Sequence, residues 1–300
     1  MKKVCAIVVT FNRLELLKEC VMKLESSDSH LNHILIFNNN STDGTDKWLN
    51  LISENNDKFI IVNNDANLGG AGGFSKAIEI ATELTNDEFL WVMDDDTMPY
   101  EDALSGLLEA TNVVSNNFGF LCSYVEWNDG TPVNMPVLNG KSWFELLNEQ
   151  LIRVDRATFV SVLIKTQKVE ELGLPASDMV IWGDDSEYTN RLSNSAPSYL
   201  VPRSIVHHKT PVKVTDVNII TDDINRIHRY YYSYRNALVV ARLYSSRKKV
   251  VKIVIKDMIM LCKLVFTKAD HKWKRITSLI KGTISGLFFA PKIKFIKLSR

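Results

Sequence analysis

Three consecutive aspartates, Asp94, Asp95 and Asp96, follow the apolar run EFLWVM and are the clearest sign of chemistry in this sequence. Adjacent like charges repel one another, and a hard divalent cation that also bridges to phosphate oxygens would relieve that repulsion. Successive side chains of a strand point to opposite faces, so Asp94 and Asp96 can share a face while Asp95 points away. The alternative is a helix N-cap with an acidic first turn. The position of the triplet directly after an apolar run favours the metal site.

Two further groups of polar residues occur later in the chain. The stretch WGDDSEY contains Asp184, Asp185 and Glu187 after an apolar segment, where the carboxylates could cap the helix that follows. The β-like run YLVPRSIVHHK ends in His207 and His208. A neutral imidazole could complete a metal site with the aspartates, and an ordinary structural histidine is the alternative.

The stretch NLGGAGGF at 67–74 places four glycines in five positions, between a β-like run and a helix-like run. Glycine weakens either kind of element by roughly 0.5–1 kcal/mol, so its use suggests a positive φ or a close approach of the backbone. A turn that leads into a helix N-terminus also favours an anion. A tight connection with a helix cap is the alternative interpretation.

The first half of the chain alternates apolar β-like runs with helix-like segments. The runs at 4–11, 33–39, 59–64 and 88–93 are mostly apolar, and helical patterns at 13–27, 45–55 and 74–84 separate them. This alternation predicts an α/β fold with a mostly parallel sheet that is covered on both faces. Ligands of such folds bind beyond the carboxyl ends of the strands, where each of these runs ends in polar residues.

The remainder divides into a less regular middle part and a helical, basic end. Shorter β-like and helical pieces fill about 120–210, so we predict one domain over residues 1–215 and a helical region over 216–300. Residues 245–300 hold 15 Lys and Arg against 2 Asp and Glu, which indicates an anionic partner, either a membrane or a nucleic acid. A helix over VVKIVIKDMIMLCKLVF would place Lys249, Lys252, Lys256 and Lys263 on one narrow face, as in interfacial helices. A core helix with a solvated lysine edge is the alternative.

Composition and cysteine spacing indicate whether the chain folds and in which kind of compartment. With 45% hydrophobic and 24% charged residues, the chain has the composition of a folded protein. Its cysteines, at 5, 20, 122 and 262, lack metal-ligand or redox spacing and are expected to be buried thiols in a reducing compartment. The short apolar run at the start lacks a small-residue cleavage site, so we expect no signal peptide. No apolar stretch reaches the ~18–20 residues needed to span a bilayer.

Taken in order, the motifs resemble one known family. VVTFNR, NNNSTDGT, NLGGAGGF, VMDDD, WGDDSEY and VHHK follow one another over about residues 4–210. This combination is similar to the family 2 inverting glycosyltransferases of the GT-A fold, and within them to the galactofuranosyltransferase-like and rhamnosyltransferase-like branch that builds bacterial surface polysaccharides. The glycine stretch followed by three aspartates favours the galactofuranosyl members. The resemblance implies a Rossmann-like GT-A catalytic domain, and it does not cover the basic C-terminal region in detail.

Carried onto the matching positions, the resemblance implies roles for individual residues. Asp185 matches the general base, with Asp184 beside it, and Asp96, Asp94 and His208 match the metal ligands, His208 being preferred to His207. The nucleotide-sugar site would comprise Thr10, Asn12, Arg13, Asn39, Asp43, Gly69, Gly70, Gly72, Gly73, Asp94, Asp95 and Trp182. The family often has an aspartate where this chain has Asn38, which leaves open how the nucleotide base is read.

The implied reaction is metal-dependent glycosyl transfer with inversion, using Mn²⁺ or Mg²⁺. A UDP-sugar, with UDP-galactofuranose as the best guess, would donate to a lipid-linked oligosaccharide in capsule or O-antigen synthesis. A rhamnosyltransferase or a UDP-hexopyranose transferase is the alternative within the fold. The basic region would hold the enzyme peripherally at the cytoplasmic face of the cell membrane.

Two functions of other classes compete with this interpretation. A nucleotidyltransferase would require a lysine- or arginine-bearing phosphate loop near the N-terminus, where VTFNRLE supplies only Arg13. A non-catalytic nucleic-acid-binding protein would use the basic region. Because its charges are mixed with long aliphatic residues and lack an aromatic stacking motif, we expect no nucleic-acid partner. The oligomeric state is not predicted.

Overall fold

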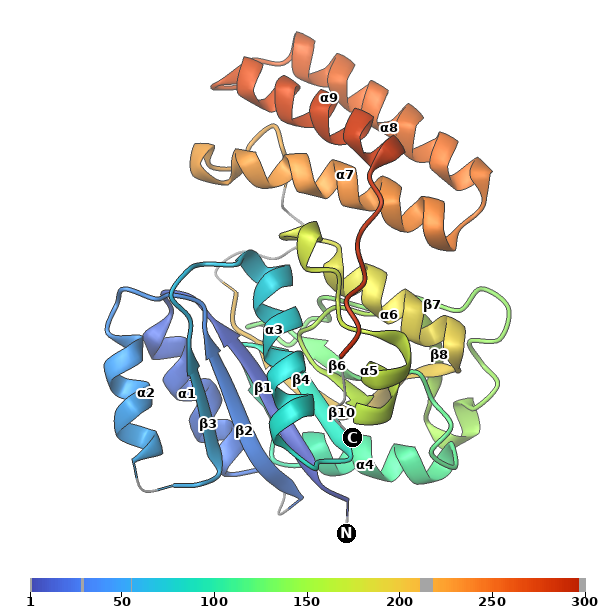
Figure 1. Cartoon of the computed structure of the whole chain (residues 1–300). Helices are drawn as coiled ribbons and strands as arrows, with labels where there is room; N and C mark the ends of the chain where they lie inside the picture. The colour runs from blue at the N-terminus through green and yellow to red at the C-terminus, as the bar shows by residue number, and fades with distance from the viewer. Residues whose placement is uncertain (1, 28–29, 55, 211–217, 297–300) are drawn as a thin grey trace.

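A computed structural model describes residues 2–27, 30–54, 56–210 and 218–296, and one sheet runs through the body of the molecule (Figure 1). Its strands lie in the order β3-β2-β1-β4-β9-β6-β10-β8-β7, and β5 pairs with β10. The strands are β1 Val4–Thr10, β2 Leu31–Asn38, β3 Phe59–Asn63, β4 Phe89–Asp94, β5 Thr97–Pro99, β6 Leu121–Glu126, β7 Val137–Leu138, β8 Ile152–Arg156, β9 Val162–Lys165 and β10 Ser198–His208. Strands β1 to β4 are parallel, so their carboxyl ends meet at one edge. The predicted α/β fold with a mostly parallel central sheet is confirmed.

Helices cover both faces of this sheet because the strands are apolar on both sides. In β1, Val4, Ala6 and Val8 pack with α1, α2 and α4 on one face. The intervening residues, from Cys5 to Val9, pack with α3, α5 and α6 on the other face. The helices of the body are α1 Leu14–Glu25, α2 Thr45–Ser53, α3 Gly69–Leu84, α4 Ala103–Val113, α5 Thr166–Leu172 and α6 Asp184–Ser195. Short 3-10 turns occur at Leu147–Glu149, Ser177–Met179 and Ile224–Arg226.

One helix begins earlier than the sequence predicts. We expect a glycine turn followed by a helix over 74–84, whereas α3 already begins at Gly69 and contains all four glycines in its first turns. Close packing explains this difference. A Cβ on Gly73 would lie 2.8 Å from Val9 Cγ1, and one on Gly69 would lie 2.6 Å from the Val180 carbonyl oxygen.

The end of strand β10 lies beside the aspartate triplet. It runs parallel to β6 and antiparallel to the short strand β5, with His208 opposite Thr97. Thr97 directly follows Asp96 in the chain. The register therefore brings the end of β10 to the residue after the three aspartates, across more than a hundred residues of sequence.

The C-terminal region folds as three helices that lie above the body (Figure 1), α7 Ile227–Tyr244, α8 Arg247–Phe266 and α9 Lys272–Phe288. Helix α9 packs closely on α7, since a Cβ on Gly282 or Gly286 would lie 2.5–2.7 Å from carbonyl oxygens of α7. None of the helices described is long and apolar enough to cross a bilayer.

The last described segment returns from α9 to the body. The N–H of Leu174, beyond α5, donates to the carbonyl of Lys294 at 2.8 Å. The ammonium of Lys294 also contacts Glu79 of α3. The helical unit, residues 218–288, is therefore tied to the body by its C-terminal segment. The predicted boundary at 215 lies outside the described residues, and the division into 1–215 and 216–300 stays a prediction.

The expected burial of the cysteines holds for three of the four. Cys5, Cys20 and Cys122 are buried, and burial raises the pKa of each thiol. Cys262 of α8 is exposed, contrary to the expectation. It lies on a helix whose apolar residues are only partly covered by α7 and α9.

Candidate active site

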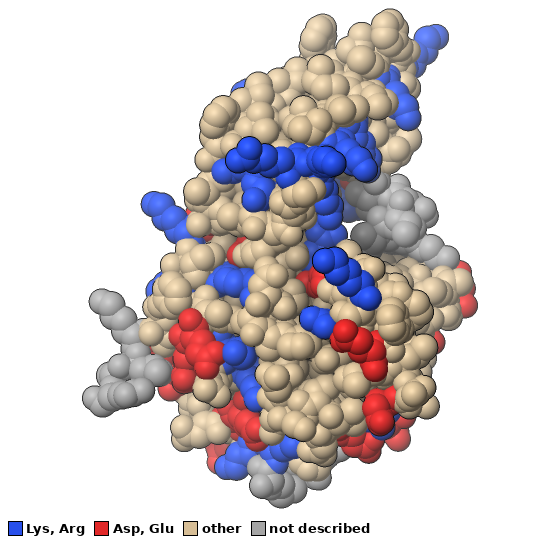
Figure 2. All heavy atoms as spheres, turned by 90° about the vertical axis from the view of Figure 1, so that its right-hand side faces the viewer, with Lys and Arg blue, Asp and Glu red and all other residues tan. Residues whose placement is uncertain are grey.

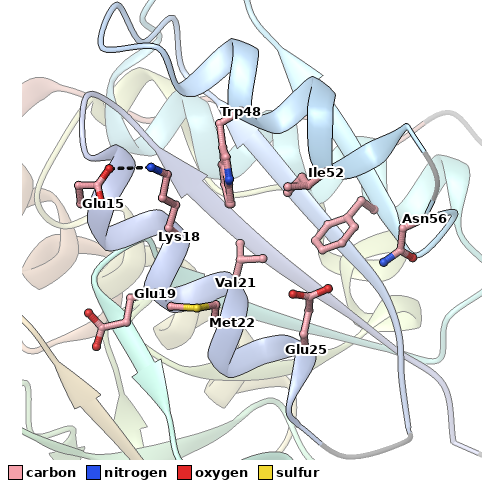
Figure 3. A pocket seen from close by; sticks show the side chains of 10 residues that line it. Glu15, Lys18, Glu19, Val21, Met22, Glu25, Trp48, Ile52 and Asn56 are labelled. Carbon is pink, nitrogen blue, oxygen red and sulfur yellow. Dashed lines mark hydrogen bonds and ion pairs between the residues drawn. The ribbon is translucent and has the colours of Figure 1, made fainter.

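Of two sizeable cavities lined by described residues, one contains the predicted chemistry. The first, of about 700 Å³, lies between α1 and α2 (Figure 3). An apolar floor that includes Val21, Trp48 and Ile52 is bordered there by acidic residues and by an ion pair between Glu15 and Lys18. None of the predicted site residues lines this cavity. The second cavity, of about 580 Å³, lies at the carboxyl edge of the sheet and is the candidate active site.

Eight of the predicted residues line the second cavity. They are Arg13, Gly70, Asp94, Asp96, Trp182, Asp184, Asp185 and His208. They come from the ends of β1, β4 and β10, from the starts of α3 and α6, and from the segment before α6. Segments that are far apart in sequence therefore meet as expected for strand ends of an α/β sheet.

Asp94, Asp96 and His208 form a group that could hold a metal ion. Each offers one ligand atom, and these atoms lie within 4.8 Å of one another. Ligand atoms on opposite sides of a divalent ion are about 4 Å apart, so small side-chain adjustments suffice for binding. Asp96 and His208 are buried, and Asp94 is half-buried.

The orientation of His208 supports this fit. Its Nδ1 lies 2.9 Å from Oδ1 of Asn134, an atom that only accepts, which favours the proton on Nδ1. The lone pair of Nε2 then faces Oδ1 of Asp96 at 3.1 Å, and a cation between these two acceptors would satisfy both. The neighbouring His207 points elsewhere, with its Nε2 2.9 Å from Oδ1 of Asn128.

Asp95 lies beside the candidate metal group and positions Arg13. It accepts from the hydroxyl of Thr10 at 2.8 Å and from Nη1 of Arg13 at 3.2 Å. The same Nη1 contacts Oδ2 of Asp96 at 2.5 Å. Asp95 is buried and does not line the cavity. It thus fixes a guanidinium at the rim of the carboxylate cluster.

Electrostatics at the triplet favour a bound cation. Burial, and then the charges of Asp96 and Asp95, raise the pKa of Asp94. Burial raises the pKa of Asp95 to about 6, although Arg13 opposes this. Burial would also raise the pKa of Asp96, but the adjacent His208 and Arg13 side chains lower it below its usual value. A divalent ion would stabilise the charged form of all three carboxylates.

The carboxylate pair Asp184 and Asp185 begins α6 and faces the same cavity. Burial and then the charge of Asp185 raise the pKa of Asp184 to about 7. Burial also raises the pKa of Asp185, while the Ser186 N–H, which donates to it at 2.5 Å, opposes the shift. A carboxylate with a raised pKa is a stronger proton acceptor once it is ionised.

The segment before α6 has an uncommon backbone that the helical unit holds in place. Val180, Trp182 and Gly183 have φ values of 67°, 58° and 111°. Asn236 of α7 donates through Nδ2 to the carbonyls of Met179, Ile181 and Trp182 at 2.8–3.1 Å. Arg235 also donates to carbonyls at the start of this segment. The helical unit therefore fixes the backbone that presents the carboxylate pair.

The other predicted nucleotide-site residues lie outside the cavity and make structural contacts. Asn39 accepts from the N–H of Leu68 at 2.8 Å and donates to the Gly69 carbonyl at 3.0 Å, joining β2 to α3. Asp43 accepts from the N–H of Leu14 at 3.0 Å and from Thr45, and Asn12 accepts from the N–H of Thr42 at 2.7 Å. Of the four glycines, Gly70 alone lines the cavity. Binding roles for these positions stay predictions.

Several cavity residues were missed by the sequence analysis. Asn134 faces His208, and Thr158, Phe159 and Thr210 line the wall. Arg226 and Arg229 come from the start of the helical unit. These two arginines lie within the predicted helical region, 216–300, but nothing in their local sequence signals a place beside the aspartates.

Comparison with known proteins is consistent with this site. A family described as Glycosyl transferase family 2 matches residues 5–165, more than half of the chain. The chain is 28% identical over 207 residues to galactofuranosyltransferase GlfT1 of Mycolicibacterium smegmatis, a match that covers 64% of this chain and 66% of that protein.

Solved structures share the fold at low sequence identity. GalNAc-T7, crystallised with UDP, GalNAc and Mn²⁺, has a TM-score of 0.61 and 14% identity, over 81% of this chain and 48% of that chain. The mannosyltransferase PcManGT from Pyrobaculum calidifontis, in complex with GDP-Man and Mn²⁺, has a TM-score of 0.56 and 16% identity, over 95% and 87% of the two chains. S. aureus TarS 1-349 has a TM-score of 0.55 and 12% identity, over 94% and 90%. These likenesses confirm the predicted GT-A fold. The family match, which includes the aspartate triplet, shows that the chain belongs to glycosyl transferase family 2.

Proposed function

We propose that this protein is an inverting, metal-dependent glycosyltransferase that uses a nucleotide sugar. The observation that carries this proposal is the meeting of two carboxylate groups in one cavity, the metal-type group Asp94, Asp96 and His208 and the pair Asp184 and Asp185. Inversion requires a base on one side of the sugar and stabilisation of the leaving group on the other. The two groups supply these functions.

The protein's own residues carry the proton and hold the substrates. Asp185, as a carboxylate, takes the proton from the acceptor hydroxyl while that oxygen attacks the anomeric carbon. The bond from that carbon to the diphosphate breaks with inversion. Asp94, Asp96 and His208 would hold Mn²⁺ or Mg²⁺, which when bound neutralises charge on the departing diphosphate. Arg13, fixed by Asp95 at 3.2 Å, adds a positive charge on this side.

For the donor we propose UDP-galactofuranose. The 28% identity to a galactofuranosyltransferase and the glycine stretch followed by three aspartates support this choice. Two neighbours crystallised with UDP or GDP-Man and Mn²⁺ support a nucleotide-diphosphate donor in general. A rhamnosyltransferase or UDP-hexopyranose transferase would use the same metal and carboxylates and differ in hydroxyl contacts.

The function is tested with purified full-length protein and a panel of UDP-galactofuranose, UDP-galactose, UDP-glucose and dTDP-rhamnose. We expect Mn²⁺-dependent hydrolysis or transfer to be fastest with UDP-galactofuranose, to stop in EDTA, and to give an inverted anomeric centre by NMR. Full activity in EDTA or retention of configuration would contradict the mechanism. A preference for another sugar nucleotide would overturn the donor alone.

For the acceptor we propose a lipid-linked oligosaccharide of a capsule or O-antigen, reached from the cytoplasmic face of the cell membrane. Helices α8 and α9 lie on the outer side of α7 (Figure 1), and their exposed apolar residues form what we term the outer face. The outer face comprises Val251, Ile255, Met258, Ile259, Phe266, Trp273, Ile284 and Phe288. Figure 2 shows Lys and Arg gathered in a band across the helical unit, with the visible Asp and Glu on the body below. Apolar side chains bordered by lysines suit the surface of an anionic bilayer.

We expect the triple substitution Val251→Ser, Ile255→Ser and Met258→Ser to weaken binding to anionic vesicles by about 10²-fold. Each of these side chains is more than half exposed, so its loss removes apolar burial in the bilayer with little effect on packing. Vesicle co-sedimentation measures the effect. The control is Met22→Ser with Leu51→Ser, which changes equally exposed apolar residues on α1 and α2. If the triple variant sediments like the unmodified protein, the outer face does not contact the membrane.

A further inference from the structure

We propose that Arg226 and Arg229 form a binding site for a phosphate or diphosphate group of a substrate, supplied to the active-site cavity by the helical unit. The inference rests on the proposed function and extends it, because it assigns residues outside the family match, which ends at residue 165.

Arg226 ends the 3-10 turn Ile224–Arg226, and Arg229 lies in the first turn of α7. Both side chains line the cavity that contains Asp94, Asp96 and Asp185. The cavity thus has two walls that differ in charge. The body supplies carboxylates for a cation, and the helical unit supplies guanidinium groups for an anion.

Arg229 has no hydrogen-bonded or ion-paired counter-charge in the part of the chain that the structure describes. It is partly buried, and no hydrogen bond or ion pair joins it to another described residue. Burial, and then the positive charges of Arg226 and Arg13, lower its pKa, and the charge of Asp222 opposes this shift in part. Arg13 is already paired with Asp95 and Asp96, which leaves Arg226 and Arg229 as neighbouring cations at the cavity. An anion between them would relieve their repulsion.

Arg226 has spare donors on the same side. Its Nε lies 3.6 Å from Oδ2 of Asp222, beyond hydrogen-bond distance, and that oxygen already accepts from the hydroxyl of Tyr230 at 2.9 Å. Nε of Arg226 has no hydrogen-bond partner among the described residues. Asp222 thus lies beside Arg226 but leaves the Nε–H donor of this guanidinium without a hydrogen-bond partner among the described residues.

The chemical class of the ligand follows from these donors. Guanidinium groups bind phosphate oxygens in bidentate fashion, and two of them can enclose a diphosphate. Both proposed substrates contain phosphate: the donor as a nucleoside diphosphate, and a lipid-linked acceptor through its lipid phosphate.

Calorimetric titration of the full-length protein with UDP and Mn²⁺, and separately with farnesyl diphosphate, distinguishes these sources. In Arg226→Gln with Arg229→Gln we expect about 10–100-fold weaker binding of one or both probes, the range for hydrogen bonds to charged groups. Loss for UDP alone assigns the site to the donor, and loss for farnesyl diphosphate alone assigns it to the acceptor. A variant with Arg226→Gln and Arg229→Lys keeps one positive charge at the site. It should bind the probes more tightly than the double glutamine variant.

The control is Arg203→Gln, which removes a partly exposed arginine that is paired with Glu109 at 2.6 Å and is not among the residues that line the cavity. It should bind both probes like the unmodified protein. Thermal melts verify that each variant is folded. If the double variant is folded and binds both probes unchanged, the proposal is wrong. If the unmodified protein fails to bind UDP with Mn²⁺, the proposed function fails instead, whatever the arginines do.

Discussion

Asp96→Asn is expected to lower metal-dependent transfer by at least about 10²-fold. Asp96 is the buried member of the candidate metal group that contacts both His208, at 3.1 Å, and Arg13. Replacing its carboxylate by an amide removes one anionic ligand and the acceptor that faces Nε2 of His208. A divalent ion contributes several kcal/mol of transition-state stabilisation, and each 1.36 kcal/mol is a factor of ten in rate.

The measurement pairs Mn²⁺ titration by calorimetry with turnover of the preferred sugar nucleotide. Asp95→Asn is the matched control for metal affinity, since Asp95 is the adjacent buried aspartate but bonds to Thr10 and Arg13. We expect Asp95→Asn to keep its Mn²⁺ affinity within a few-fold, whereas Asp96→Asn should lose most of it. Equal Mn²⁺ affinities in the two variants would show that Asp96 is not a ligand.

Asp185→Asn is expected to reduce transfer by roughly 10²–10⁴-fold while donor binding survives. The amide keeps the size and polarity of the side chain but cannot accept a proton. A loss of about 10²–10⁴-fold is the range expected when a general base is removed. The variant should bind UDP with Mn²⁺ like the unmodified protein, which separates loss of chemistry from loss of fold.

The pH dependence of transfer provides a second measurement on the same pair. Burial raises the pKa of Asp185, and a base must be ionised to act, so activity should rise with pH as this carboxyl loses its proton. Asp184→Asn removes a neighbouring carboxyl whose pKa is raised to about 7. Because the charge of Asp185 raises the pKa of Asp184, Asp185 ionises first, so we expect this variant to stay active with an acidic limb close to that of the unmodified protein. If Asp184→Asn is inactive and Asp185→Asn is active, the base is Asp184.

The sequence pattern was sufficient to predict the sheet and the edge that carries the site. Continuous apolar runs such as residues 4–10 must be buried on both faces, so parallel strands with helices on either side follow from local pattern alone. Polar residues at the ends of these runs then lie at one edge. The position of Asp94 to Asp96 at that edge needed no knowledge of distant contacts.

The choice between the two histidines depended on tertiary pairing. His207 and His208 are adjacent, so on a strand they point to opposite faces, and the sequence favours one only through a resemblance. The antiparallel pairing of β10 with β5 places His208 opposite Thr97 and its imidazole against Asp96. That register joins segments more than a hundred residues apart, which no local periodicity encodes.

The reason for the glycines at 69–73 also depended on contacts between distant segments. Their composition predicted a turn beside a ligand, but Gly69 and Gly73 are needed because a Cβ would collide with Val180 and Val9. Likewise, the positive charge of the C-terminal region was evident from composition, whereas the placement of Arg226 and Arg229 at the cavity was not. Composition and local periodicity determine which elements form and which faces they bury. Contacts between distant segments decide which side chains meet, because those contacts are set by the packing of the whole chain.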